Sequence, residues 1–122
     1  DVSGLVNGFH FEDYTHVLLK ELSTGNWKKA YLITAFALRP KLLLLDEPVN
    51  GLDFQSTEFL YQLMGGYKQH GTLLFSSHIL ESICLTSDRV LVLAHGRIGQ
   101  AFTGDEIAAK NIREMLADEE HH

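Results

Sequence analysis

The stretch Lys41-Leu42-Leu43-Leu44-Leu45-Asp46-Glu47-Pro48 decides the fold of this 122-residue sequence. Four consecutive leucines without polar alternation predict a strand that is buried on both faces, as in a parallel sheet. The strand ends in two carboxylates at the edge where open α/β sheets place their ligand sites. Asp46 is suited to Mg²⁺, and Glu47 is suited to positioning an attacking water molecule. Taken alone, these residues fit equally well a strand that simply ends in turn-forming residues.

The sequence on either side of this strand alternates between helical and strand patterns. Ser23 or Thr24 is expected to cap a helix upstream, and Asp53 is expected to cap one downstream. The expected helices cover residues 11–20, 27–38, 54–69, 79–85 and 104–116, with Asp105 capping the last, and the expected strands cover 42–45, 72–76, 89–93 and 97–102. This order predicts an α/β fold with a largely parallel sheet flanked by helices and a C-terminal antiparallel hairpin.

The helix over 27–38 is expected to bury one stripe of side chains and to end before Pro40. The apolar stripe at helical spacing comprises Ala30, Tyr31, Ile33, Thr34, Ala37 and Leu38.

Composition excludes several classes of protein. Hydrophobic residues make up 45% and charged residues 21%, which is typical of a folded domain and argues against wholesale disorder. The formal net charge of −6 disfavours binding to nucleic acid, because neutralising phosphates requires a basic surface. Cys84 is the one cysteine, so an internal disulfide is impossible and a reducing compartment is expected. The sequence has no apolar run of the roughly 18 to 20 residues that a membrane-spanning helix needs.

Three further motifs surround the central strand. Glu21-Leu22-Ser23-Thr24-Gly25-Asn26 lies at the start of a helix, Asn50-Gly51-Leu52-Asp53 follows the carboxylates, and the next strand runs into Ser76-Ser77-His78. Taken singly, the three motifs fit an ordinary helix cap, a turn and a structural histidine. Together and in this order, they resemble the ATP-binding cassette (ABC) ATPase family from about residue 12 to 107. The resemblance implies a partial P-loop-NTPase-like fold.

The resemblance also implies roles for single residues, with ATP and Mg²⁺ as cofactors. Residues 42–46 match the Walker B strand, which makes Asp46 the Mg²⁺ ligand. Glu47 matches the catalytic glutamate, and His78 matches the switch histidine that contacts the γ-phosphate. The cofactor-binding positions are those of the signature motif and the D-loop: Ser23, Thr24, Gly25, Asn26 and Asp53. Thr24 and Asn26 depart from the glycine and glutamine of the family signature. Because Ser23 and Gly25 are kept, the motif is still expected to be competent to contact phosphate.

The phosphate-binding pattern G-x-x-x-x-G-K-[ST] does not occur in the 122 residues. In the family this loop precedes the signature. We therefore expect that the sequence begins inside a longer protein and that the chain alone neither binds ATP tightly nor hydrolyses it. Residues 1–120 are expected to be the C-terminal part of one nucleotide-binding domain, with a helical part at 1–39 and the remainder at 40–117. His121-His122 fits a tag remnant and equally the end of a native acidic tail.

The sequence is compatible with three functions. The favoured one is the ATP-hydrolysing subunit of an ABC transporter, cytoplasmic and peripheral at the inner face of the cell membrane. Its expected partners are a transmembrane permease subunit and a second nucleotide-binding domain. The alternatives are a soluble ABC ATPase of translation or DNA repair, and a non-catalytic interaction module that self-associates through exposed sheet edges.

Overall fold

The computed structural model describes residues 2–120. The chain forms two compact units, one ending at Ser77 and the other beginning at His78. His121-His122, for which a tag or an acidic tail was expected, lies outside the described residues.

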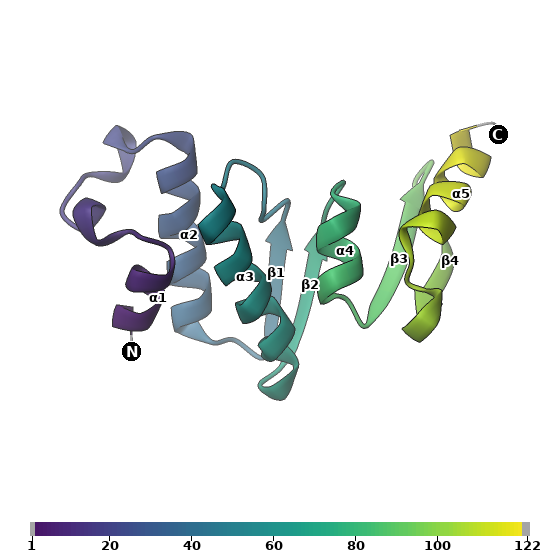
Figure 1. Ribbon diagram of the computed structural model, residues 1–122, viewed down its shortest axis with the longest axis horizontal. Coiled ribbons are helices and arrows are strands. Elements are labelled where there is room, and N and C mark those ends of the chain that lie inside the picture. Colours follow the sequence, from purple (N-terminus) through teal and green to yellow (C-terminus); the bar gives the residue numbers. More distant parts are fainter. Residues whose placement is uncertain (1, 121–122) are drawn as a thin grey trace. The chain divides into compact units, whose positions relative to one another are not determined.

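The first unit contains helices and a pair of parallel strands (Figure 1). Its strands are β1 (Leu42–Asp46) and β2 (Thr72–Ser76), paired so that Asp46 lies opposite Ser76. The predicted parallel pairing is therefore confirmed. The helices of this unit are α1 (Val2–Gly8), α2 (Thr24–Leu38) and α3 (Phe54–Gly66), and 3₁₀ turns occur at Glu12–Tyr14, Leu19–Glu21 and Tyr67–Gln69.

The central strand β1 is buried on one face, so the expectation of burial on both faces is wrong for this chain. Leu43 and Leu45 are 6% and 3% exposed, whereas Leu42 and Leu44 are 58% and 60% exposed. Successive side chains of a strand point to opposite faces, so the described residues cover only the face of Leu43 and Leu45.

Of the two predicted caps, Ser23 is the one that α2 uses, so the helix begins at Thr24, ahead of the expected range 27–38. Its last residue is followed by Arg39 in the left-handed region (φ 49°), and Pro40 then prevents its continuation. The predicted stripe of buried residues is wrong in detail, since only Ile33 among those positions is buried. The side chains that α2 buries lie at i, i+3, i+4 and i+7 and are Lys29, Leu32, Ile33 and Phe36. A lysine thus occupies the buried face of the helix.

The expected helix over 11–20 is also wrong, because this segment contains only two short 3₁₀ turns. Phe11 is buried, but Val17 and Leu18 are exposed. An isolated helix of this length needs packing against a core to offset its costly nucleation. This segment buries too few of its apolar side chains to provide that packing.

Helix α3 begins at the predicted Asp53 cap and ends at Gly66, earlier than the expected boundary at 69. A 3₁₀ turn follows directly over Tyr67–Gln69. The two glycines at the end of α3 have low helix propensity, which agrees with this early termination.

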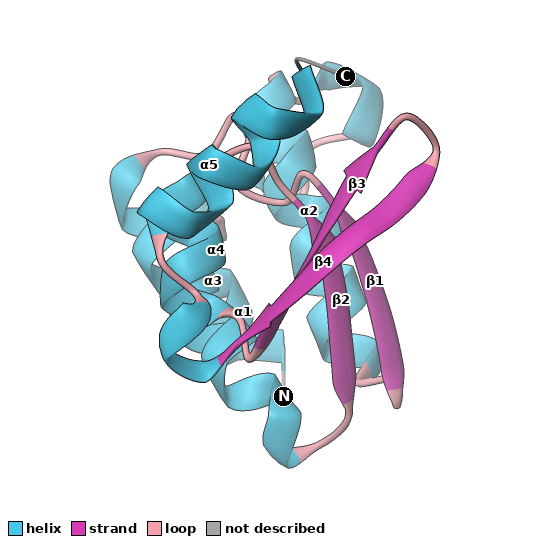
Figure 2. Ribbon diagram, turned by 90° about the vertical axis from the view of Figure 1, so that its right-hand side faces the viewer, coloured by secondary structure: helices cyan, strands magenta, loops and turns pink. Residues whose placement is uncertain are grey.

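The second unit contains α4 (Leu80–Thr86), β3 (Arg89–Ala94), β4 (Arg97–Thr103) and α5 (Ala109–Glu120). Strands β3 and β4 pair antiparallel, as predicted, and Figure 2 shows them as two arrows joined by a short loop. His95 and Gly96 both have positive φ (52° and 73°), the geometry of the two-residue turns that match strand twist. The core of this unit is formed by Val90, Val92, Phe102 and Ile112, with Leu80, Ile83, Cys84, Ile107 and Met115 packed against it.

The prediction for the last helix is wrong at its start. Residues Gly104–Glu106 form a 3₁₀ turn, and α5 begins only at Ala109. Asp105 lies inside this 3₁₀ turn and so does not cap α5; the turn itself begins at Thr103, which forms a reciprocal capping box with Glu106. The turn ends at Ile107, whose backbone is not helical (φ −77°, ψ 86°), and this separates it from α5.

Among the described residues, no helix is long and apolar enough to cross a membrane.

Candidate functional site

The motifs of the first unit meet at one edge of its strand pair. Strand β1 ends at Asp46, and the N-termini of α2 and α3 lie at the same edge, uppermost in Figure 1. The loop of residues 47–53 joins β1 to α3; we call it the catalytic loop because it begins at Glu47, which the sequence predicts to be catalytic. The carboxyl edge of parallel strands is the usual place for a ligand site in α/β folds.

Asp46 ends β1 with an exposed carboxylate. The Ser76 hydroxyl, at the end of the neighbouring strand, donates a hydrogen bond to Asp46 Oδ1. Burial raises the pKa of the Tyr31 hydroxyl, and the negative charge of Asp46 raises it further. Asp46 therefore presents hard oxygen ligands beside a phenol that stays protonated at neutral pH.

Glu47 is half-buried and adopts the left-handed backbone conformation, with φ of 47°. Its backbone N–H donates to the Ser76 carbonyl (3.1 Å) and the Ser76 hydroxyl (3.1 Å). Its carbonyl accepts from Lys28 Nζ at 2.8 Å, and its Oε2 accepts from Asn50 Nδ2 at 3.3 Å. The residue predicted to be catalytic is thus anchored on both sides of its Cα.

Asp53 closes the catalytic loop and caps α3. Its Oδ1 accepts from the Ser56 backbone N–H at 2.8 Å, and its Oδ2 pairs with Lys29 Nζ at 3.1 Å. The bond from the Ser56 backbone is the main cause that lowers the pKa of the Asp53 carboxyl. The Ser56 side chain and the Lys29 ammonium also lower this pKa, while partial burial opposes them. Asp53 is therefore ionised over a wider pH range than a free carboxyl.

The signature residues form the N-terminus of α2. Ser23 caps the helix, since its Oγ accepts the Asn26 backbone N–H at 3.2 Å. A Cβ added to Gly25 would lie 2.7 Å from the Gly51 carbonyl oxygen, closer than real Cβ contacts allow. Gly25 thus permits the signature to approach the catalytic loop. Thr24, beside it, is exposed.

His78 is the one predicted site residue in the second unit, where it is exposed and lies between β2 and α4. The structure brings together the predicted residues of the first unit: Ser23, Thr24, Gly25, Asn26, Asp46, Glu47 and Asp53.

Lys28 and Lys29 were missed at the sequence level. Both contact the catalytic loop, Lys28 at Glu47 and Lys29 at Asp53. Lys29 is 7% exposed and lies on the same helix face as Leu32 and Ile33. A cation within a buried apolar stripe requires a partner, and that signal was available in the sequence.

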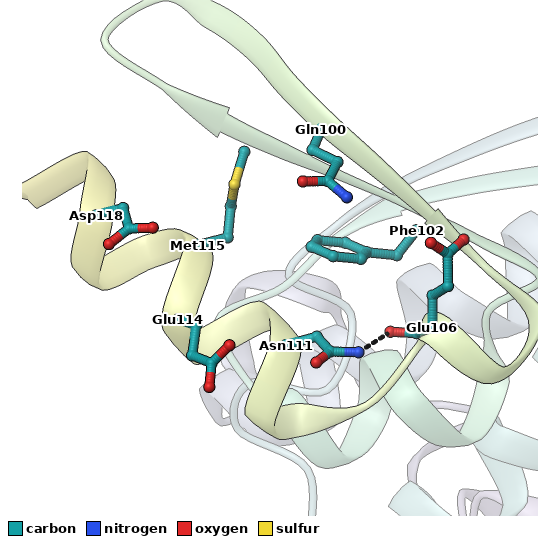
Figure 3. A pocket seen from close by; sticks show the side chains of 7 residues that line it. All are labelled: Gln100, Phe102, Glu106, Asn111, Glu114, Met115 and Asp118. Carbon is teal, nitrogen blue, oxygen red and sulfur yellow. Dashed lines mark hydrogen bonds between the residues drawn. The ribbon is translucent and has the colours of Figure 1, made fainter.

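A groove in the second unit carries none of the predicted residues (Figure 3). Phe102 and Met115 extend toward its centre, and the Asn111 side chain donates to the Glu106 carbonyl at 2.9 Å. Its lining includes three carboxylates, from Glu106, Glu114 and Asp118, and no basic side chain. A carboxylate-lined groove repels phosphate, so this groove does not suit a nucleotide.

The chain is similar to known proteins whose names describe them as ATP-binding. A family described as "AAA domain, putative AbiEii toxin, Type IV TA system" matches residues 5–83. The putative ABC transporter ATP-binding protein AlbC of Bacillus subtilis is 41% identical over 97 residues, covering 79% of this chain and 41% of that protein. The xylose import ATP-binding protein XylG of Pectobacterium atrosepticum is 34% identical over 104 residues, covering 84% of this chain and 20% of that protein.

Solved structures agree with these relatives. An ATP-binding subunit of an ABC transporter superimposes with a TM-score of 0.79 and 27% identity, covering 97% of this chain and 48% of that one. The chain therefore spans less than half the length of these relatives and of this structure.

Proposed function

The chain belongs to the ABC ATPase family of nucleotide-binding domains, and from this premise we propose that it is the catalytic-loop half of a subunit that hydrolyses ATP to drive transport across a membrane. The observation that carries the proposal is the anchored position of Glu47. It lies one residue beyond the exposed Asp46 carboxylate and beside the N-terminus of the signature helix α2.

Asp46 is the proposed ligand of Mg²⁺. The described residues contain no cluster of three or more His, Cys, Asp or Glu side chains that could enclose a metal ion. This donor set fits Mg²⁺, which typically binds one or two carboxylates and takes its other ligands from phosphate oxygens and water. When bound, the ion neutralises charge on the phosphates.

Glu47 is the proposed base that orients and deprotonates the attacking water. A carboxylate performs this role when its oxygen is held within hydrogen-bond reach of that water. Asn50 already donates to one oxygen, Oε2, and the backbone bonds of Glu47 fix the start of the side chain. These contacts support a preset orientation of the carboxylate.

The remaining family roles complete the proposal. The N-terminus of α2, with Ser23, Thr24, Gly25 and Asn26, offers backbone N–H groups and a positive dipole end to phosphate. Asp53 fixes the D-loop beside it, and His78 donates to the γ-phosphate. The 122 residues contain no phosphate-loop pattern, so the chain alone is proposed to be inactive.

The proposed partners are a transmembrane permease subunit and a second nucleotide-binding domain, with the protein peripheral at the cytoplasmic face of the membrane. AlbC and XylG carry names of transporter ATP-binding proteins, which supports this choice. Co-purification of the complete protein with a permease, and ATP turnover that rises on reconstitution with it, would test the transport role.

The catalytic assignment is tested by Glu47→Gln in the complete nucleotide-binding domain. Steady-state turnover of MgATP should fall at least about 100-fold, because the amide cannot accept the proton of water. Glu58→Gln is the matched control, since Glu58 is an exposed glutamate on α3. Turnover should be unchanged in the control. Wild-type turnover by Glu47→Gln would refute the role of Glu47.

A further inference from the structure

The backbone of Glu47 adopts a conformation that its residue type does not favour. Its φ of 47° lies in the left-handed region, which residues other than glycine, asparagine and aspartate rarely visit. Such a conformation persists when the surrounding structure over-determines it, and it is frequent at functional sites. The contacts that hold Glu47 therefore bear on where its carboxylate points.

One of these contacts comes from a charged side chain of the signature helix. Lys28 Nζ donates to the Glu47 carbonyl oxygen at 2.8 Å, and the Asn50 backbone N–H donates to the same oxygen at 3.3 Å. The bond from Lys28 is charge-assisted, partly buried and shorter, so it is the stronger of the two. On the other side of the residue, the N–H of Glu47 is fixed by Ser76.

The neighbouring residues of α2 hold the rest of the catalytic loop. Lys29 pairs with the side chain of Asp53 at the far end of the loop, and Gly25 meets the Gly51 carbonyl between the two ends. Lys28 differs from Lys29 because its partner is the backbone of the residue proposed to be catalytic. Its loss would remove the stronger of the two bonds to the Glu47 carbonyl.

We propose that Lys28 is a positioning residue, which fixes the peptide plane after Glu47 and thereby aims the Glu47 carboxylate at the attacking water. The inference rests on the proposed function of Glu47. Lys28 acts through the backbone of Glu47 and needs no contact with ATP. Its removal should therefore slow the chemical step and leave nucleotide affinity unchanged.

The test measures MgATP turnover by the complete nucleotide-binding domain carrying Lys28→Met. The value of kcat should fall about tenfold or more, since small misplacements of a catalytic group have effects of this size, while KM stays within about twofold. Lys28→Arg should restore kcat to within about threefold, because a guanidinium can donate to the same carbonyl. If Lys28→Met does not fold, Lys28→Ala carries the same prediction, since alanine has no side-chain donor.

Lys41→Met is the matched control. Lys41 also donates from Nζ to a backbone carbonyl, that of His70 at 3.2 Å, but this bond lies at the opposite end of β1. The control should keep wild-type kcat. Equal losses in both variants, or wild-type kcat in Lys28→Met, would overturn the inference.

Glu47→Gln, measured beside these variants, separates the two proposals. If it abolishes turnover while Lys28→Met has no effect, the function stands and the role of Lys28 fails. If Glu47→Gln turns over ATP normally, the proposed function itself fails.

Discussion

The catalytic loop of the first unit and the hairpin of the second unit are stabilised by different kinds of contact. In the first unit, the catalytic loop is held by polar contacts from α2, chiefly those of Lys28 and Lys29. In the second, a hairpin and two helices enclose an apolar core around Val90 and Phe102. Directional bonds can fix a loop in an unfavourable backbone conformation, as at Glu47, whereas apolar burial is non-directional. Polar contacts, rather than apolar ones, are therefore expected to fix the geometry of a catalytic residue.

The largest effect on stability is expected from breaking the apolar core of the second unit. Phe102→Ala should destabilise it by about 3 to 5 kcal/mol, because a buried aromatic ring is replaced by a cavity. Native-state hydrogen exchange should show loss of amide protection in β3 and β4. Leu93→Ala, on the same hairpin but 71% exposed, should change stability by less than about 0.5 kcal/mol. Similar losses in the two variants would show that the core is not where the structure locates it.

A smaller effect is expected where α2 approaches the catalytic loop. Gly25→Ala should cost about 1 to 3 kcal/mol, because the new Cβ would meet the Gly51 carbonyl and the loop would have to shift. Gly65→Ala is the control, since Gly65 also lies in a helix but has open space around it. That control should gain up to about 1 kcal/mol from helix propensity. Chemical denaturation of both variants measures the difference, and equal gains would mean that the close approach is absent.

The smallest effect is expected at the Asp53 cap. Asp53→Ala should destabilise the protein by about 1 to 2 kcal/mol at neutral pH, through loss of the α3 cap and of the ion pair with the buried Lys29. The pKa of Asp53 is lowered in the folded protein, so its contribution is present above its ordinary value of 3.8. The contribution disappears as the pH falls through the lowered pKa. The stability difference between wild type and Asp53→Ala should therefore shrink on acidification.

Asp53→Asn serves as the control, because asparagine caps helices about as well as aspartate does. It should keep most of the stability at neutral pH but lose the acid dependence that Asp53 contributes. Unfolding midpoints between about pH 2 and 7 give this measurement. A pH profile identical to wild type in both variants would contradict the role of the ionised carboxyl.

Much of the fold could be predicted because its signals are local. The leucine run of β1, the Ser23 and Asp53 caps and the His95-Gly96 turn each depend on neighbouring residues, and each appears in the structure. The segment 11–20 has helical spacing without a core to pack against, so its pattern was misleading.

The geometry of the site depends on contacts between segments distant in sequence. Lys28 and Glu47 are 19 residues apart in sequence. Neither residue type predicts that the Glu47 carbonyl accepts a hydrogen bond from the Lys28 ammonium. The left-handed conformation of Glu47 was equally hidden, because glutamate has no preference for it. The motifs thus identified Asp46 and Glu47 as candidates, but how the loop is held required the structure.

The central claim is that Glu47 acts in the chemical step of ATP hydrolysis, and a single-turnover experiment tests it most directly. The complete nucleotide-binding domain carrying Glu47→Gln is mixed in excess with labelled MgATP, and the bound nucleotide is analysed after acid quench. The account predicts that binding affinity stays within about threefold of wild type and that the label is recovered as ATP, since the interaction removed is one made only in the transition state. Formation of ADP at the wild-type rate would contradict it.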